Sequence, residues 1–412
     1  MKSRKNFWIT LCFLNLAVVA LFGAIMRSKI LFSIPFIDYR SILSAHSHFA
    51  FGGWVGLALI TLLIYQLLPL HIAEKKIYQW ILLGIEVSSV GMALTFPFIG
   101  YAFPSIFFST LYILVSYVFG WTFFKDILLL KGEKVIRWLA LSSVGSLILS
   151  SIGPFGLSYI LITKSSNALL YRDSVYTFLH FQYNGFFALA VFAIFFSLLV
   201  KKGMYLNAPV KRFAIFLCLS IVPSVFLALL WHNQIIFYVL AAIGCLLIFI
   251  SLVLFLPVYK LSIKARLFSH PLARAFWIIS FLSFGIKMLL TIGTIYPPLG
   301  NAVYGARPVI IGFLHLVFLA FVTFYIFSHV IEEGAFNRKG KLIALPFYIF
   351  GFGVIANEVL LMVQGLEILL KTNNPIYNQF LWVASILLVI GALLIAFVRL
   401  RIGNLSQEKS QR

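Results

Sequence analysis

Twelve long apolar runs constrain the fold of this chain more than any other feature of its sequence. Each is about 20 residues or longer, which at 1.5 Å per residue is enough to cross a bilayer as a helix. Only 10% of the 412 residues are charged, and the runs use up nearly the whole chain. The pattern therefore predicts an all-α polytopic bundle of 12 transmembrane helices, forming a single integral membrane domain over residues 1–412. The runs lie at 7–26, 41–69, 77–98, 103–124, 135–155, 174–200, 210–231, 234–257, 273–295, 307–331, 341–363 and 378–400.

The net charge of +21 is explained by membrane topology. If the N-terminus is cytoplasmic, 24 Lys and Arg residues fall on the cytoplasmic side and 7 on the outer side, while Lys287 lies inside a run. This bias is the positive-inside rule, so the charge indicates no nucleic-acid partner. We expect a multi-pass protein of the cell (inner or plasma) membrane, with both termini cytoplasmic and with anionic lipid as a partner.

Five of the eight histidines share one depth in the predicted topology, the outer third of the membrane. They are His46, His48, His180, His232 and His315, and they come from four different spans. A single histidine in a span is usually a hydrogen-bonded core residue. Neutral imidazole is also the commonest nitrogen ligand of haem iron, copper and zinc, and a metal site needs ligands from several helices at one level. The shared depth therefore predicts a haem or metal site.

His46 and His48 are only two residues apart. On a regular helix they point about 200° apart, so both can serve one site only if the helix begins between them. His48, Gly52 and Gly56 share a helix face, and small residues beside a histidine leave a flat slot for a porphyrin. This interpretation favours His48. The alternative is that the glycines form a helix-packing face.

Three arginines lie just outside the histidine-bearing spans. Arg40, Arg172 and Arg307 flank the second, sixth and tenth runs. A guanidinium can bind a haem propionate through two hydrogen bonds, so each is a candidate haem-binding residue. The alternative is that they anchor the helices at the membrane interface.

Twelve spans with outer histidines on spans 2, 6, 7 and 10 resemble subunit I of the haem–copper oxidase and nitric oxide reductase superfamily. The spacings of 52 residues from His180 to His232 and of 83 from His232 to His315 are similar to those of the family. The resemblance implies that His46 or His48, together with His315, are haem ligands. It implies that His180 and His232 are copper ligands.

Departures from the family pattern reduce the expected cofactor set. Asn233 stands where the family has a second helix-7 histidine, and the second helix-10 histidine would fall at Val317 or Phe313. The chain can therefore supply one bis-histidine haem, or one five-coordinate haem beside a copper held by two histidines.

The residues expected to support oxygen reduction are also altered. Tyr183 is the candidate catalytic tyrosine, but it lies three residues after His180, and Asn184 holds the fourth position, where the family places its redox tyrosine. Gln182 stands where a proton-channel glutamate is often found. The chain also resembles NnrS-like proteins, which are twelve-span haem–copper membrane proteins linked to nitric oxide stress.

Three ionisable residues lie inside predicted spans. Glu86, Lys287 and Glu358 would each be costly in lipid, so they should pair or line a hydrated path. They could form a proton route toward the outer histidines. The alternative is a structural pair of Lys287 with Glu358 or with Glu86. Buried charges of this kind would also suit a proton-coupled transporter.

The leading hypothesis is a divergent haem–copper oxidase-like protein that binds haem near the outer face for oxygen or nitric oxide chemistry. The second is a haem or metal sensor, or a stress or assembly protein, on the same scaffold. The third is the transporter. The sequence contains no C-x-x-C-H haem motif, so electrons would come from another subunit, a soluble cytochrome or quinol.

Overall fold

The computed structural model describes residues 3–204, 208–300, 306–336, 341–370, 372 and 374–408. It is 88% helical, and the described residues form no β-strand. Helices satisfy all backbone N–H and C=O groups within one segment, as the lipid interior requires. Twelve helical segments in these ranges are long and apolar enough to cross a membrane, which confirms the number of spans predicted from the sequence.

Most of the spans are one helix, and five are built from two or three consecutive helical segments. The segments are α1 (Ser3–Leu31), α2 (Tyr39–Phe49), η1 (Ala50–Gly56), α3 (Leu57–Leu67), α4 (Leu70–Ala73), α5 (Lys76–Ile99), α6 (Phe103–Leu128), α7 (Lys134–Ser150), α8 (Ile152–Thr163), α9 (Ala168–His180), η2 (Phe181–Phe187), α10 (Ala188–Lys201), α11 (Ala208–Ser224), η3 (Val225–His232), α12 (Ile235–Lys264), α13 (Pro271–Gly293), α15 (Arg307–His315), η4 (Leu316–Thr323), α16 (Phe324–Glu332), α17 (Lys341–Leu369) and α18 (Ile376–Glu408). The sixth span, for example, comprises α9, η2 and α10.

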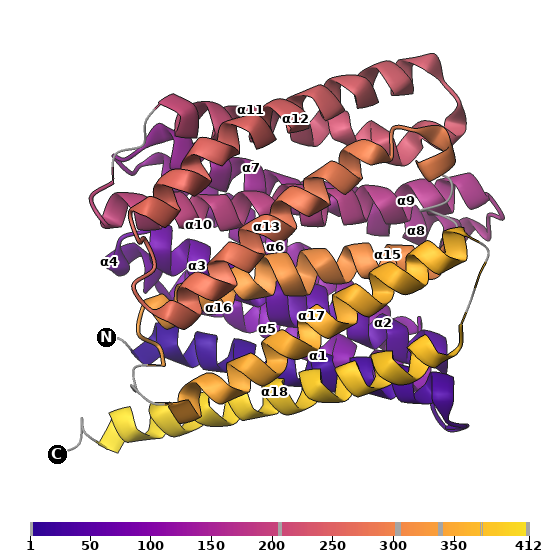
Figure 1. Ribbon diagram of the computed structural model, residues 1–412, viewed down its shortest axis with the longest axis horizontal. Coiled ribbons are helices and arrows are strands. Elements are labelled where there is room, and N and C mark those ends of the chain that lie inside the picture. The colour runs from indigo at the N-terminus through magenta and orange to yellow at the C-terminus, as the bar shows by residue number, and fades with distance from the viewer. Residues whose placement is uncertain are drawn as a thin grey trace.

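The start of α1 and the end of α18 lie at the same end of the bundle, as an even number of spans requires (Figure 1). We call this end the terminal face and the opposite end the far face. The segments α2, α9 and α15 lie toward the far face, and α3, α10 and α16 lie toward the terminal face. The expected outer position of the histidines therefore corresponds to the far half of the molecule.

The second and sixth spans are the most enclosed. In their most apolar stretches 78% and 89% of residues are buried, against 22% in the fourth span. Aromatic rings fill the interior around the sixth span, where Phe192 lies 4.8 Å from both Phe213 and Phe284 between ring centroids. The histidines of these two spans thus project from interior helices.

Local signals fix where two histidine-bearing segments begin and end. Asp38 caps α2 by accepting a hydrogen bond of 2.8 Å from the backbone N–H of Ser41, and this bond lowers the pKa of the Asp38 carboxyl. Pro223 cannot donate a backbone hydrogen bond. Shortly after it, at Val225, the α-helix gives way to the tighter 3₁₀-helix η3, which ends at His232. Because α2 runs unbroken through His46 and His48, the helix does not begin between them.

Candidate functional site

A cavity of about 310 Å³ lies in the far half of the bundle. Its walls come from α1, α2, η1, α15, η4, α17 and α18, so it joins the start, middle and end of the chain. The deeper lining is mainly apolar and includes Leu16, Trp54 and Phe350. Polar and charged side chains lie among the remaining lining residues, and they determine what the cavity can hold.

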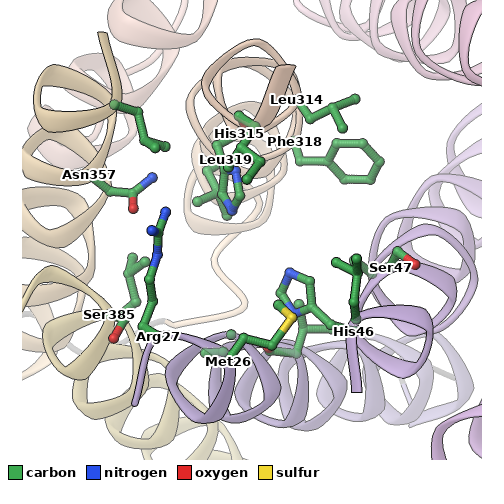
Figure 2. Close-up of a pocket in the computed structure, with 18 of the residues that line it drawn as sticks. Met26, Arg27, His46, Ser47, Leu314, His315, Phe318, Leu319, Asn357 and Ser385 are labelled. Carbon is green, nitrogen blue, oxygen red and sulfur yellow. Dashed lines mark hydrogen bonds between the residues drawn. The ribbon is translucent and has the colours of Figure 1, made fainter. Parts of the chain in front are cut away.

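His46 and His315 enter this cavity from α2 and α15. Figure 2 shows their rings pointing toward one another across it. The Nδ1 atom of His46 lies 3.0 Å from the carbonyl oxygen of Val19, and Nδ1 of His315 lies 2.8 Å from that of Ile311. A carbonyl only accepts, so each Nδ1 carries the proton and each neutral ring keeps its lone pair on Nε2. Two imidazoles oriented by backbone carbonyls, each with Nε2 available, form a typical metal-ligand arrangement.

Two arginines stand beside the histidines. Arg307, at the start of α15, donates a hydrogen bond of 2.7 Å to the hydroxyl of Tyr39, and Arg27 reaches the cavity from α1 (Figure 2). Arg307 was predicted from the sequence, whereas Arg27 was missed. The sequence could have suggested Arg27 as a candidate, because it directly follows the first apolar run just as Arg40 directly precedes the second. Arg40 itself is not among the residues that line the cavity.

His48 faces another part of the bundle. Its ring packs on Phe96, with 4.6 Å between ring centroids, and its Nδ1 lies 2.8 Å from the carbonyl oxygen of Ser44. The flat slot predicted beside it is filled by other side chains. A Cβ atom at Gly52 would come within 2.7 Å of the Ser89 hydroxyl.

Gly56 is equally close to a neighbour, because its Cβ would lie 2.7 Å from the Tyr112 hydroxyl. The glycine face is therefore a helix-packing face, the alternative that the sequence left open. The preference for His48 over His46 has no support in this geometry, because it is His46 that shares a cavity with His315.

Three of the four histidine-bearing spans change to a π-helix close after a histidine. The π-helical segments are η1, η2 and η4, and they begin two residues after His48 and directly after His180 and His315. In a π-helix the backbone hydrogen bonds join residues five apart instead of four, which widens the turn and leaves some backbone groups free to bond elsewhere. In η1 the carbonyl oxygen of Gly53 accepts a hydrogen bond of 2.8 Å from the Asn15 side chain of α1. These wider turns thus set the directions of the neighbouring side chains.

His180 lies apart from the cavity and has both ring nitrogens engaged. Its Nε2 donates to the carbonyl oxygen of Ile221 at 2.8 Å, and its Nδ1 accepts from the Asn184 amide at 3.0 Å. Asn184 therefore occupies, with its amide N–H, the nitrogen of His180 that a metal would need. No lone pair of His180 is left for a metal ion in this arrangement.

His232 forms a separate cluster near the far face. Its Nε2 lies 2.9 Å from Oδ2 of Asp173, and the Trp231 indole donates a hydrogen bond of 2.8 Å to Oδ1 of the same carboxylate. The guanidinium of Arg172 lies 3.9 Å from the centroid of the Trp231 ring. Arg172 and His232 thus belong to this cluster and not to the cavity of His46 and His315. Both residues lie near the far face, where a side chain can anchor its helix at the membrane interface.

The three intramembrane charges do not pair with one another. Lys287 is fully buried and its ammonium lies 3.4 Å from the Met288 sulfur, while its distance to the Tyr183 ring centroid is 5.6 Å. Glu86 accepts a hydrogen bond of 2.7 Å from Asn15.

Glu358 accepts one of 3.2 Å from Asn357, which also lines the cavity. Among the described residues no ion pair joins Lys287 to either glutamate, so the structural pair expected as an alternative is not formed.

The cavity residues fit a haem better than a copper ion. Within the parts of the chain that the structure describes, no three His, Cys, Asp or Glu side chains gather as a metal site. A haem needs only two axial ligands, with charged partners for its propionates and apolar walls. The chain matches no protein-family model, and no curated protein is similar to it in sequence. The functional argument therefore depends on this geometry.

Proposed function

We propose that this chain is a membrane haem protein, a divergent relative of haem–copper oxidase subunit I, in which His46 and His315 hold one haem. The observation that carries the proposal is the pair of Nε2 atoms that face one cavity, with each Nδ1 bonded to a backbone carbonyl oxygen. A haem bound between them would carry one electron by cycling between its ferric and ferrous states.

The residues around the two histidines have distinct roles in this proposal. The carbonyl oxygens of Val19 and Ile311 keep the protons on Nδ1 and fix the ring planes. Arg27 and Arg307 would bind the two propionates by charge-assisted hydrogen bonds at the far side of the cavity. Trp54 lines the cavity and would help to exclude water from a bound haem.

His46 and His315 would both hold the haem iron, and the iron would then not be free to bind oxygen or nitric oxide. The geometry therefore favours electron transfer over gas activation, and Tyr183 has no metal-bound partner in the proposed arrangement. Gas binding at this site would require His46 or His315 to leave the iron. The electron donor would be another subunit, a soluble cytochrome or a quinol.

The deciding experiment is optical spectroscopy of the detergent-purified protein expressed with ample haem. We expect a Soret band, sharp α and β bands after reduction with dithionite, and no shift on adding CO. The His315→Ala variant should open one axial position and acquire a CO-sensitive Soret band. The matched control is His48→Ala, whose ring packs on Phe96 outside the cavity, and its spectrum should equal that of the wild type.

The other outcomes separate the competing functions. A wild-type Soret band that shifts with CO would indicate a five-coordinate haem, and so a sensor of, or an enzyme acting on, a diatomic gas. No Soret band and no bound iron would overturn the proposal and leave the proton-coupled transporter as the leading function, with the arginine-bearing cavity as its substrate site.

A further inference from the structure

The turn between α6 and α7 presents three exposed lysines at the terminal face. The fourth span ends at this face, because successive spans run in opposite directions. Lys125 lies in the last turn of α6, Lys131 in the connection, and Lys134 at the start of α7, and all three are exposed. Among the residues that the structure describes, none of the three takes part in an ion pair.

The two acidic residues of this region are paired with lysines from other elements. Asp126 accepts hydrogen bonds of 2.8 Å from the Lys75 ammonium and of 2.9 Å from the Tyr78 hydroxyl. Glu133 lies 3.6 Å from the Lys211 ammonium. Neither carboxylate therefore offsets the charge of the three exposed lysines, and the turn keeps a net positive charge.

The helices that bear these lysines also expose tryptophan. Only 22% of the most apolar stretch of α6 is buried, the smallest share among the twelve spans of the described chain. Trp121 of α6 is 65% exposed and Trp138 of α7 is 48% exposed. At 1.5 Å per residue, each lies within about 10 Å of the terminal end of its helix. This is the depth of the lipid headgroups, where an indole has both an apolar environment for its ring and polar partners for its N–H.

Two contacts join the basic and aromatic groups into one surface. The Lys125 ammonium lies 4.2 Å from the centroid of the Trp121 ring, one helical turn away. The Arg137 guanidinium donates hydrogen bonds of 3.3 Å and 3.2 Å to the carbonyl oxygens of Leu128 and Leu130, so it ties α7 to the end of α6. The lysines and indoles of this hairpin are thus held close together on its lipid-facing side.

The turn between α12 and α13 provides a comparison at the same face. Lys260, Lys264 and Arg266 are exposed there as well, and none of them is in an ion pair within the described residues. None of the exposed tryptophans of the described chain belongs to α12 or α13, however. The two turns carry equal numbers of unpaired cations, and only the α6–α7 turn combines them with exposed indoles.

We propose that the α6–α7 hairpin binds an anionic phospholipid, with its phosphate among the ammonium groups of Lys125, Lys131 and Lys134 and its acyl chains along α6 beside Trp121. Ammonium groups bind phosphate as point charges, and each one near the membrane surface adds attraction for anionic lipid. The exposed apolar surface of α6 receives the chains, which a free phosphate lacks. The proposal does not depend on haem binding, because the hairpin shares no residue with the cavity of His46 and His315.

The test is quenching of tryptophan fluorescence in the full-length protein, reconstituted into phosphatidylcholine vesicles that contain a small fixed fraction of brominated phosphatidylglycerol. Bromine atoms on the acyl chains quench only the indoles that they contact. The reference is the same fraction of brominated phosphatidylcholine. We expect phosphatidylglycerol to be preferred about tenfold, and the preference to fall at high salt. The extra quenching should disappear when Trp121→Phe is combined with Trp138→Phe.

Substitution of the lysines tests the headgroup site. Lys125→Gln combined with Lys131→Gln and Lys134→Gln should reduce the preference to within about twofold of phosphatidylcholine. The matched control combines Lys260→Gln, Lys264→Gln and Arg266→Gln, which removes the same charge from the same face and should keep the preference.

Three results would overturn the proposal. The first is equal quenching of the wild type by the two brominated lipids, and the second is an equal loss of preference in both triple variants. The third applies even if the lysine variant does not fold: extra quenching that persists in the double Trp121→Phe, Trp138→Phe variant would place the lipid away from the hairpin.

Discussion

Two pairs of histidines at similar depth in the bundle have opposite surroundings. His46 and His315 each direct one nitrogen to a backbone carbonyl and leave the other facing a shared cavity. His180 uses both nitrogens for protein hydrogen bonds, and His232 is bonded to Asp173. Histidines at the same depth can therefore differ in their ability to bind a metal. A ring can bind one only if at least one of its two nitrogens is not already used in a hydrogen bond to the protein.

The same comparison explains why His180 and His232, the copper ligands implied by the sequence resemblance, are poorly placed to bind copper here. A ligand nitrogen of His180 could be freed only by breaking a buried hydrogen bond, and breaking one costs about 1–3 kcal/mol when the former partner stays unsatisfied. At the site of His46 and His315 no such hydrogen bond has to be broken, because the bond to each backbone carbonyl oxygen uses Nδ1 and leaves Nε2 toward the cavity.

The largest effect should come from removing both cavity histidines. We expect His46→Ala combined with His315→Ala to abolish haem binding, because the described residues that line the cavity include no other histidine. The double variant His180→Ala with His232→Ala should keep the wild-type spectrum. The measurement is haem content per protein after purification. Equal loss of haem in both double variants would remove the distinction between the two pairs.

The next largest effect should come from the cavity arginines. Arg27→Gln and Arg307→Gln should each weaken haem retention about tenfold, because a charge-assisted hydrogen bond contributes about 1.5–3 kcal/mol. Transfer of haem to apomyoglobin measures this directly. Arg172→Gln is the matched control, since its guanidinium stacks on Trp231 away from the cavity. An unchanged transfer rate in the Arg27 and Arg307 variants would contradict their role as propionate partners.

The sequence predicted the fold more completely than the site. Apolar runs of sufficient length fix the number of spans, because lipid permits few other structures. Five histidines at one depth likewise pointed to the far half of the bundle. What the sequence could not show is which way each side chain points, because that depends on tertiary contacts. His48 seemed better placed than His46 only because nothing in the sequence reveals that Tyr112 fills the glycine face.

Arg27 and Asn184 illustrate the same limit. Arg27 lies far from His315 in the chain, and the two meet only because α1 and α15 border one cavity. The replacement at Asn184 was visible in the sequence, but its hydrogen bond to His180 depends on the π-helical turn of η2. The burial of His329 was not predicted either, since a histidine at the end of a span carries no distinctive sequence signal.

A smaller effect is expected from crowding the cavity histidine. A Cβ atom at Gly23 would lie 3.3 Å from the Cε1 atom of His46, so Gly23→Ala should displace the ring by a few tenths of an ångström. We expect haem to remain bound with a shifted low-spin electron paramagnetic resonance signal. Gly285→Ala is the control, because nothing lies within 4 Å of its added Cβ atom. Identical spectra for the two variants would show that the His46 ring is not an iron ligand.

The smallest effect on haem should come from Asn184. Replacing it with Leu leaves the buried Nδ1 atom of His180 without its donor, and this should destabilise the protein by about 1–3 kcal/mol. The haem spectrum should be unchanged, since His180 lies outside the cavity. Thermal unfolding and optical spectra on one preparation measure both quantities. Copper binding gained by the Asn184→Leu variant, and absent from the wild type, would show that this single amide keeps His180 and His232 from binding a metal.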